Sequence, residues 1–212
     1  MYKKITLILT LVFYTQLLKS QESKFRFGIG VKPIISSIPE SKPDLGYESF
    51  YAISPSITVD YKITNNVLLS SGLEYEKKGG KGEQFVYDKN GIIIGKSAFT
   101  FNLNFLQLPV IATYRSSGKI KFYANVGLNF GYLINQSITN EDNSYPDSET
   151  NFDELELSLL LGAGIEIRCN DHLDLGFGLR NNQGLNTLES ENGALHLKTN
   201  TLGAMVNLSY NL

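Results

Sequence analysis

The stretch KIKFYANVGLNFGY, residues 119–132, alternates between apolar and polar or small residues. Every even-numbered residue from Ile120 to Tyr132 is apolar, whereas the odd-numbered ones are lysine, tyrosine, asparagine or glycine. Because successive side chains of a β-strand point to opposite faces, this pattern predicts a strand with one apolar and one polar face.

Seven further segments have the same character and bring the number of predicted strands to eight. One of them, residues 99–115, changes phase: its apolar residues are odd-numbered up to Phe105 and even-numbered from Leu106 onward. A slip of one residue turns every side chain to the other face, so we expect a β-bulge near these two residues. The other predicted strands are residues 25–32, 51–62, 67–76, 155–168, 173–180 and 201–212.

The links between these strands alternate between short and long. Short links lie at 64–66, 116–118 and 170–171, and long ones at about 33–49, 77–97, 133–153 and 181–195. Bacterial outer-membrane barrels have this asymmetry, with short periplasmic turns and long outer loops. We therefore predict an all-β fold: an eight-stranded antiparallel up-and-down transmembrane β-barrel, closed by pairing of its first and last strands.

Two closed barrels fit strands of this kind. A soluble lipocalin-like carrier would turn the apolar residues inward around a ligand, whereas a membrane barrel would turn them outward. The polar faces combine glycines with long charged residues, which suit the narrow interior of eight strands better than leucine and phenylalanine do. We therefore predict a structural network of paired charges in the lumen, with a gated ion path as the alternative. Its expected members are Arg26, Asp60, Glu74, Glu76, Lys121, Glu156, Glu166, Arg168, Asp174 and Arg180.

The first twenty residues predict export. Lys3 and Lys4 precede an apolar run from Ile5 to Tyr14, followed by polar and small residues. This is the pattern of a secretory signal peptide, and the run is too short to span a bilayer as a helix. We expect a signal peptide at 1–20 and a barrel domain at 21–212.

The composition argues against several kinds of chemistry. The 212 residues include one cysteine, Cys169, and two histidines, with a formal net charge of −2. One cysteine cannot form an internal disulfide, and a chain without basic clusters has no electrostatic footprint for nucleic acid. We expect no cofactor and no metal site.

Two histidines are candidate catalytic bases. His196 follows a segment that contains Ser190 and Glu191, and His172 lies beside Asp171 and Asp174. A base next to a serine is what acyl transfer needs, but neither place presents a motif. We therefore predict that the protein is not an enzyme, and keep an outer-membrane lipid-modifying enzyme as the alternative.

Three segments of the long links carry binding hypotheses. KKGGKG, residues 77–82, is either a flexible loop or a contact for lipopolysaccharide phosphates. FVYDKNGIII, residues 85–94, predicts a hairpin that extends beyond the membrane, with Asn90 and Gly91 at its tip. The link 133–153 is an acidic loop without EF-hand spacing, which leaves calcium binding as the lesser interpretation. Its acids are Glu141, Asp142, Asp147, Glu149 and Asp153.

The final residues, TLGAMVNLSYNL, resemble the β-signal that the outer-membrane barrel assembly machinery reads, although Leu212 stands where an aromatic residue is usual. The expected signal residues are Thr201, Gly203, Val206, Leu208, Tyr210 and Leu212. The segments 71–81, 105–115, 122–134 and this closing strand resemble the PorT-like outer-membrane β-barrel family of Bacteroidetes. The resemblance implies an eight-stranded outer-membrane barrel, and the namesake of the family is linked to a protein secretion system.

The function expected from these patterns is a structural or interaction scaffold that acts through its extracellular loops, with a role accessory to secretion as one form of it. The expected partners are outer-membrane lipids, the assembly machinery during insertion, and an unidentified extracellular or periplasmic protein. We expect a monomer with both termini in the periplasm.

Overall fold

The computed structural model describes residues 24–37, 48–87, 91–140, 152–189 and 196–212. The predicted signal peptide lies outside these residues. Two short strands, β8 (Leu188–Glu189) and β9 (His196–Leu197), pair with each other. The eight long strands are β1 (Phe25–Ser37), β2 (Glu48–Lys62), β3 (Val67–Tyr87), β4 (Ile93–Arg115), β5 (Ile120–Asn140), β6 (Leu155–Arg168), β7 (Leu173–Gly184) and β10 (Asn200–Asn211).

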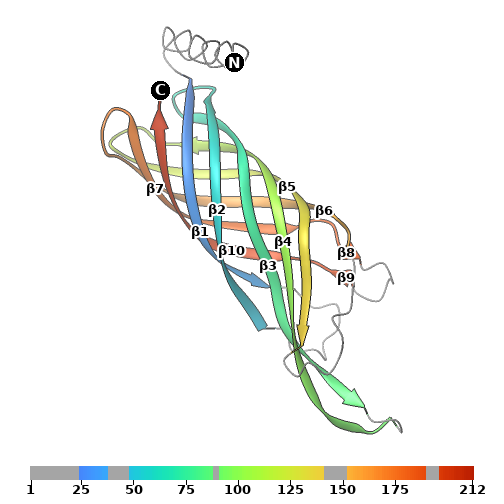
Figure 1. Ribbon diagram of the computed structural model, residues 1–212. Helices are drawn as coiled ribbons and strands as arrows, with labels where there is room; N and C mark the ends of the chain where they lie inside the picture. The colour runs from blue at the N-terminus through green and yellow to red at the C-terminus, as the bar shows by residue number, and fades with distance from the viewer. Residues whose placement is uncertain (1–23, 38–47, 88–90, 141–151, 190–195) are drawn as a thin grey trace, which may run out of the picture.

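The long strands form one closed antiparallel barrel in the order β1-β10-β7-β6-β5-β4-β3-β2. Closure is visible at Phe27, which pairs with Tyr210 of β10 on one side and with Val59 of β2 on the other. The predicted eight-stranded barrel is therefore confirmed. The start of β1 and the C-terminus lie at one end with the short turns, which we call the turn end; the opposite end is the loop end (Figure 1).

Side chains hold the turns at the turn end. The Thr64 hydroxyl accepts hydrogen bonds from the backbone N–H groups of Asn66 and Val67, at 3.2 and 3.0 Å. Asn170 Oδ1 accepts from the N–H groups of His172 and Leu173, each at 2.8 Å. Short polar side chains that bond to nearby backbone favour turns, which explains why these links are tight.

The two faces of the barrel differ as predicted. Apolar side chains point outward on every long strand, for example Ile29, Ile57 and Leu128, with exposed fractions of 62%, 56% and 41%. Polar and charged side chains point inward and are buried. Because leucine and phenylalanine cover the outside, the soluble carrier with an apolar cavity is excluded as an architecture. No helix among the described residues is long and apolar enough to cross a membrane.

The structure corrects the predicted phase change in β4. Odd-numbered side chains point inward along the described part of this strand, so Leu103 and Phe105 are buried in the lumen. The register does shift here, because Asn104 pairs with Asn135 and Phe105 with Leu133. The unpaired extra residue is Ile134 of β5, and the bulge therefore belongs to the neighbouring strand.

The predicted long link 77–97 is in large part strand. β3 and β4 stay paired as far as Tyr87 and Ile93, beyond the end of the β4–β5 ladder at Phe99 and Asn140. Gly91 lies at the tip with a φ of 78°, which glycine adopts without strain. The predicted hairpin is therefore confirmed, and it extends past the loop end of the barrel (Figure 1).

Candidate functional site

The lumen is a balanced set of charges. Among the described residues, six cations and six acids are buried, and they divide into two clusters with three of each. The turn-end cluster consists of Arg26, Asp60, Arg115, Lys121, Glu166 and Asp174. The loop-end cluster consists of Lys32, Glu74, Glu76, Lys78, Glu156 and Arg180.

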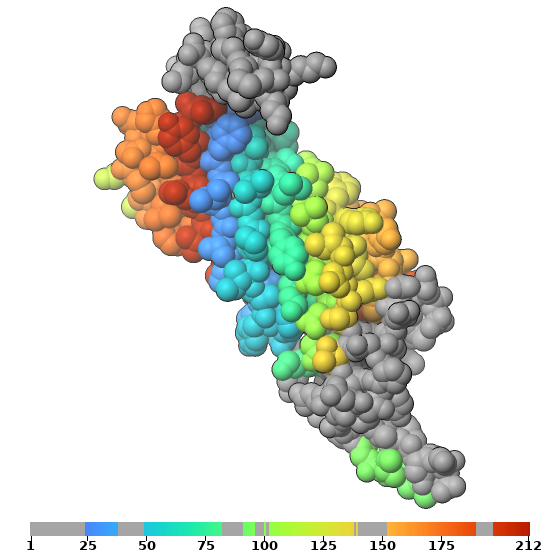
Figure 2. All heavy atoms as spheres, in the orientation of Figure 1, coloured from blue at the N-terminus to red at the C-terminus, as the bar shows by residue number. Residues whose placement is uncertain are grey.

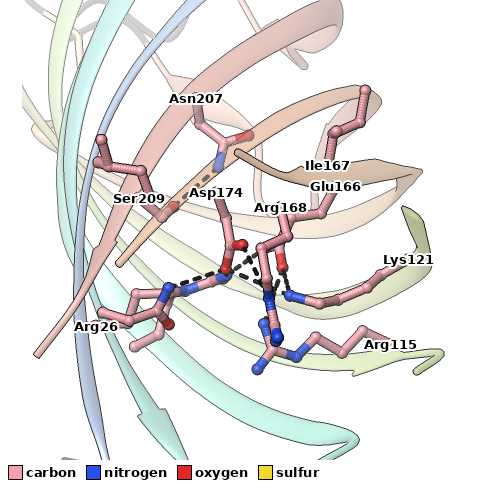
Figure 3. Close-up of polar contacts among 12 residues, drawn as sticks. Arg26, Arg115, Lys121, Glu166, Ile167, Arg168, Asp174, Asn207 and Ser209 are labelled. Atoms are coloured by element: carbon pink, nitrogen blue, oxygen red, sulfur yellow. Dashed lines mark hydrogen bonds and ion pairs between the residues drawn. The ribbon is translucent and has the colours of Figure 1, made fainter. Parts of the chain in front are cut away.

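The turn-end cluster is centred on Glu166 of β6. Its carboxylate accepts hydrogen bonds from Arg115 Nη1 at 2.9 Å and Lys121 Nζ at 2.7 Å, and also from Arg26 Nη1. These cations come from β4, β5 and β1, and Figure 3 shows them converging on the acid. One carboxylate therefore ties together strands from opposite sides of the barrel.

Two further acids complete this cluster. Asp60 lies 2.6 Å from Arg26 Nε, and Asp174 lies 3.3 Å from Lys121 Nζ. Asn211 of the closing strand also donates to Asp174, at 3.0 Å. Buried charges are tolerated when they are paired and hydrogen-bonded, and here each of the three cations has an acid within reach.

The loop-end cluster is a chain of alternating charges. Arg180 Nη1 lies 3.2 Å from Glu74, and Lys32 lies between Glu74 and Glu76, at 2.7 Å from the latter. Glu76 is also bonded by the hydroxyl of Thr201 at 2.9 Å. Neutral side chains thus supply some of the hydrogen bonds that these buried carboxylates need.

The chain ends at Lys78 and Glu156. Lys78 Nζ is 2.5 Å from Glu156 and 3.8 Å from Glu76, and it lies 5.3 Å from the centroid of the Phe105 ring. Thr199 donates to the other oxygen of Glu156. The fully buried lysine therefore joins the charged chain to an apolar layer beyond it.

That apolar layer covers the lumen at the loop end. Phe105 and Leu103 of β4 point into it, and side chains from β5 and the outer links pack against them. We call this group the apolar cap; its members are Leu103, Phe105, Leu133, Phe152, Leu188 and Leu197.

Between the two clusters lies a cavity of about 70 Å³ whose lining is mostly polar but includes Leu68, Ile111 and Met205. Asn125 Oδ1 and Asn207 Oδ1 face it without a hydrogen-bond partner in the protein. Such a cavity is large enough for water that can satisfy these groups. Gly164 and Gly178 make room beside it for Tyr123, because a Cβ on Gly178 would lie 3.1 Å from the Tyr123 ring.

Nine of the ten residues predicted for the lumen network are buried there. The exception is Arg168, whose side chain is 53% exposed and reaches Asp174 only at 4.0 Å. It is the last residue of β6, so water at the turn end solvates it. Sequence reasoning left Lys32, Lys78 and Arg115 out of the network, although Lys32 and Arg115 have the inward parity of their strands.

The other candidate residues do not form a site in the described structure. The His172 ring stacks on Tyr210 at 5.6 Å, and its Nδ1 lies 3.2 Å from the carbonyl oxygen of Asn211, as expected of a structural residue. His196 pairs through its backbone with Glu189, whereas Ser190 and Glu191 lie outside the described residues. Cys169 is an exposed free thiol.

The acidic loop remains a prediction, because Glu141, Asp142, Asp147 and Glu149 lie outside the described residues. Asp153 accepts a hydrogen bond from the Glu189 backbone at 3.0 Å. Among the described residues, no group of three or more acids, histidines or cysteines is arranged to hold a metal ion.

The predicted assembly signal lies on β10. Thr201 and Gly203 face the lumen, whereas Val206, Leu208 and Tyr210 face outward and are about two-fifths exposed, at 39%, 41% and 45%. Leu212 follows the strand and is exposed.

Known proteins share this architecture. The surface protein NspA of Neisseria matches with a TM-score of 0.55 and 14% identity, over 90% of this chain and 98% of that one. The outer membrane protein OprG of Pseudomonas aeruginosa matches with a TM-score of 0.50 and 10% identity, over 90% and 96%. At such identities the likeness concerns the fold alone. No curated protein matches the sequence significantly.

The family assignment comes from the sequence itself. Residues 19–189 match the family described as outer membrane protein beta-barrel domain. That range covers β1 to β7, with the turn-end cluster and most of the loop-end contacts. An outward apolar surface, a polar lumen and the family match agree on location. The chain therefore belongs to the outer membrane protein beta-barrel domain family and is a protein of the outer membrane.

Proposed function

We propose that this protein is a non-enzymatic outer-membrane scaffold whose β3–β4 hairpin binds a protein partner beyond the loop end. The observation that carries the proposal is the length of this hairpin. Its ladder continues through five residues of β3, from 83 to 87, after the β4–β5 ladder has ended. Figure 2 shows the tip in light green at the end of the molecule farthest from the C-terminus.

The tip has the chemistry of a protein contact. Ile92, Ile93 and Ile94 follow one another and are 62%, 54% and 65% exposed. Consecutive exposed apolar residues that lie beyond a membrane mark a protein interaction site. Where the hairpin has left the barrel, no described strand pairs with the outer edge of β3 or β4, and an open edge is a template for an added strand.

The lumen supports a scaffold more than a channel. Two neutral clusters and the apolar cap occupy the interior of an eight-stranded barrel, a size that side chains fill. In this proposal the charged residues hold the wall in shape, and recognition takes place outside it.

The proposal includes an orientation and a biological setting. Short turns and both termini are periplasmic and the hairpin is extracellular, as in other bacterial barrels. Lipids surround a monomeric barrel, and the assembly machinery reads β10. The resemblance to the PorT-like family of Bacteroidetes makes an exported protein, or a component of an export apparatus, the first class of partner to examine.

A photo-crosslinking amino acid at Ile93 tests the proposal in intact cells. We expect a discrete protein adduct from position 93 and none from Thr187, an exposed residue of the link after β7. Changing the neighbours Ile92 and Ile94 to serine should remove the adduct, because it removes the apolar contact without altering the barrel. Equal labelling from positions 93 and 187 would contradict the proposal.

A further inference from the structure

The outer wall of the barrel is indented around Pro33 of β1. Pro33 has no N–H to donate, and the β1–β10 ladder skips it between the pairs Val31–Val206 and Ile34–Gly203. Opposite, a Cβ on Gly203 would lie 2.8 Å from Ile34 Cγ2. Ile34 and Gly203 both face the lumen, and the missing Cβ of Gly203 leaves room for Ile34, which is buried to 2% exposure.

The neighbouring segment of β2 stays outside. Its ladder to β3 is interrupted between the pairs Ser49–Gly80 and Ser56–Glu74. Within the interruption Tyr51 is 73% exposed. Behind it β1 bonds directly to β3, because the N–H of Gly79 donates to Ser36 Oγ at 3.1 Å. The outer wall therefore has a step, at which β2 lies farther from the barrel axis than β1 does.

This step creates an apolar groove on the outside of the barrel, with a volume of about 550 Å³. Residues 33–35 of β1, residues 51–53 of β2, Leu179 of β7 and residues 202–204 of β10 line it. The Tyr51 hydroxyl is the one polar side-chain group among the lining residues. The main residues are Pro33, Ala52, Ala204, Tyr51, Leu179 and Leu202.

We propose that this groove binds one acyl chain of an outer-membrane lipid at a fixed position on the barrel. The groove is continuous with the outward apolar surface, which is the surface in contact with the membrane. Its volume lies in the range of sites that enclose small ligands, and its lining offers no charge to a polar one.

The driving force is close packing. Lipid tails are as apolar as leucine, so moving a chain from the bilayer into the groove gains little from the hydrophobic effect. A chain in the groove, however, contacts protein on several sides, whereas a chain on a convex wall contacts it on one. Each additional atom contact contributes a small dispersion energy, and the sum favours the concave site.

The absence of tryptophan from the sequence allows a direct test. Leu202 lines the groove and Leu161 does not, yet both pair with Asn181 and they are exposed to 50% and 49%. L202W and L161W are therefore a matched pair of single-tryptophan variants. Each is purified in a short-chain detergent, checked for the folded form by its unboiled gel mobility, and titrated with phosphatidylcholine that carries brominated acyl chains.

We expect half-maximal quenching of L202W at about a threefold lower lipid-to-detergent ratio than for L161W. Each quenching curve is scaled to its own maximum, so a difference in how deep the two tryptophans lie among the acyl chains does not affect the comparison. Ala204→Phe fills the groove and should remove the difference, whereas Ala163→Phe, which also pairs beside Leu179, should leave it.

Equal ratios for L202W and L161W would overturn the proposal, as would a difference that survives Ala204→Phe. Resistance of L202W to quenching would also overturn it, because a second copy of the chain would then cover the groove. These outcomes are independent of the hairpin, which lies beyond the barrel wall.

Discussion

The two charged clusters of the lumen have the same composition and different connectivity. In the turn-end cluster, three cations converge on the single carboxylate of Glu166. In the loop-end cluster, the charges alternate along a chain from Arg180 to Glu156, helped by hydroxyls such as that of Thr201. Replacing Glu166, which we call the hub, removes an ion pair from three cations at once. Replacing one residue of the loop-end chain removes only the ion pairs that this residue makes. Two clusters with equal numbers of charged residues are therefore expected to differ in their tolerance to mutation.

Replacement of the hub should have the largest effect. Glu166→Gln leaves Arg26, Arg115 and Lys121 with only Asp60 and Asp174 as counter-charges. Removing one partner from a buried ionic group typically costs about 3–5 kcal/mol, and we expect a loss in that range. The free energy of unfolding is measured in urea, with the folded fraction read from unboiled gel mobility. A loss below that of the chain variant described next would contradict the hub.

Replacement at the end of the chain should cost less. Glu156→Gln leaves Lys78 within 3.8 Å of Glu76, so the expected loss is about 1–3 kcal/mol. Adding Lys78→Met removes the cation as well, and the double variant should be more stable than the sum of the single losses implies. Additive losses in the urea assay would mean that the two residues do not act as a pair.

Arg168 gives the smallest expected effect. Its side chain is half exposed and only approaches Asp174, so Arg168→Met should change the free energy of unfolding by less than about 1 kcal/mol. The same assay measures it beside Glu166→Gln. A loss as large as that of the hub variant would place Arg168 inside the cluster after all.

Alternation was enough to predict the barrel and most of its interior. Residues at inward positions of a two-residue period, such as Glu74, Glu156 and Asp174, are buried as expected, because one apolar face leaves a charged side chain no other place to go. The turns were predictable for a similar local reason, since Asn and Thr side chains bond to adjacent backbone.

The loop end was less predictable. Lysines and glycines at 77–82 have the composition of a loop. Lys78 is nevertheless buried, because β3 continues through this segment and Lys78 forms an ion pair with Glu156 of β6. The alternation pattern predicts that Leu103 and Phe105 face outward, because it places apolar residues only on the outer face. Their inward position follows from the apolar cap, whose other members come from distant segments that one strand's pattern does not reveal.

The equal numbers of cations and acids in the lumen have an electrical consequence. The buried charges of the described residues sum to zero, so neither a transmembrane voltage nor a surface potential performs net work on these groups as a set during insertion. Because each cluster is neutral by itself, these buried groups also have little charge separation along the barrel axis. The free energy of inserting these buried groups should therefore not depend on the electric field across the membrane.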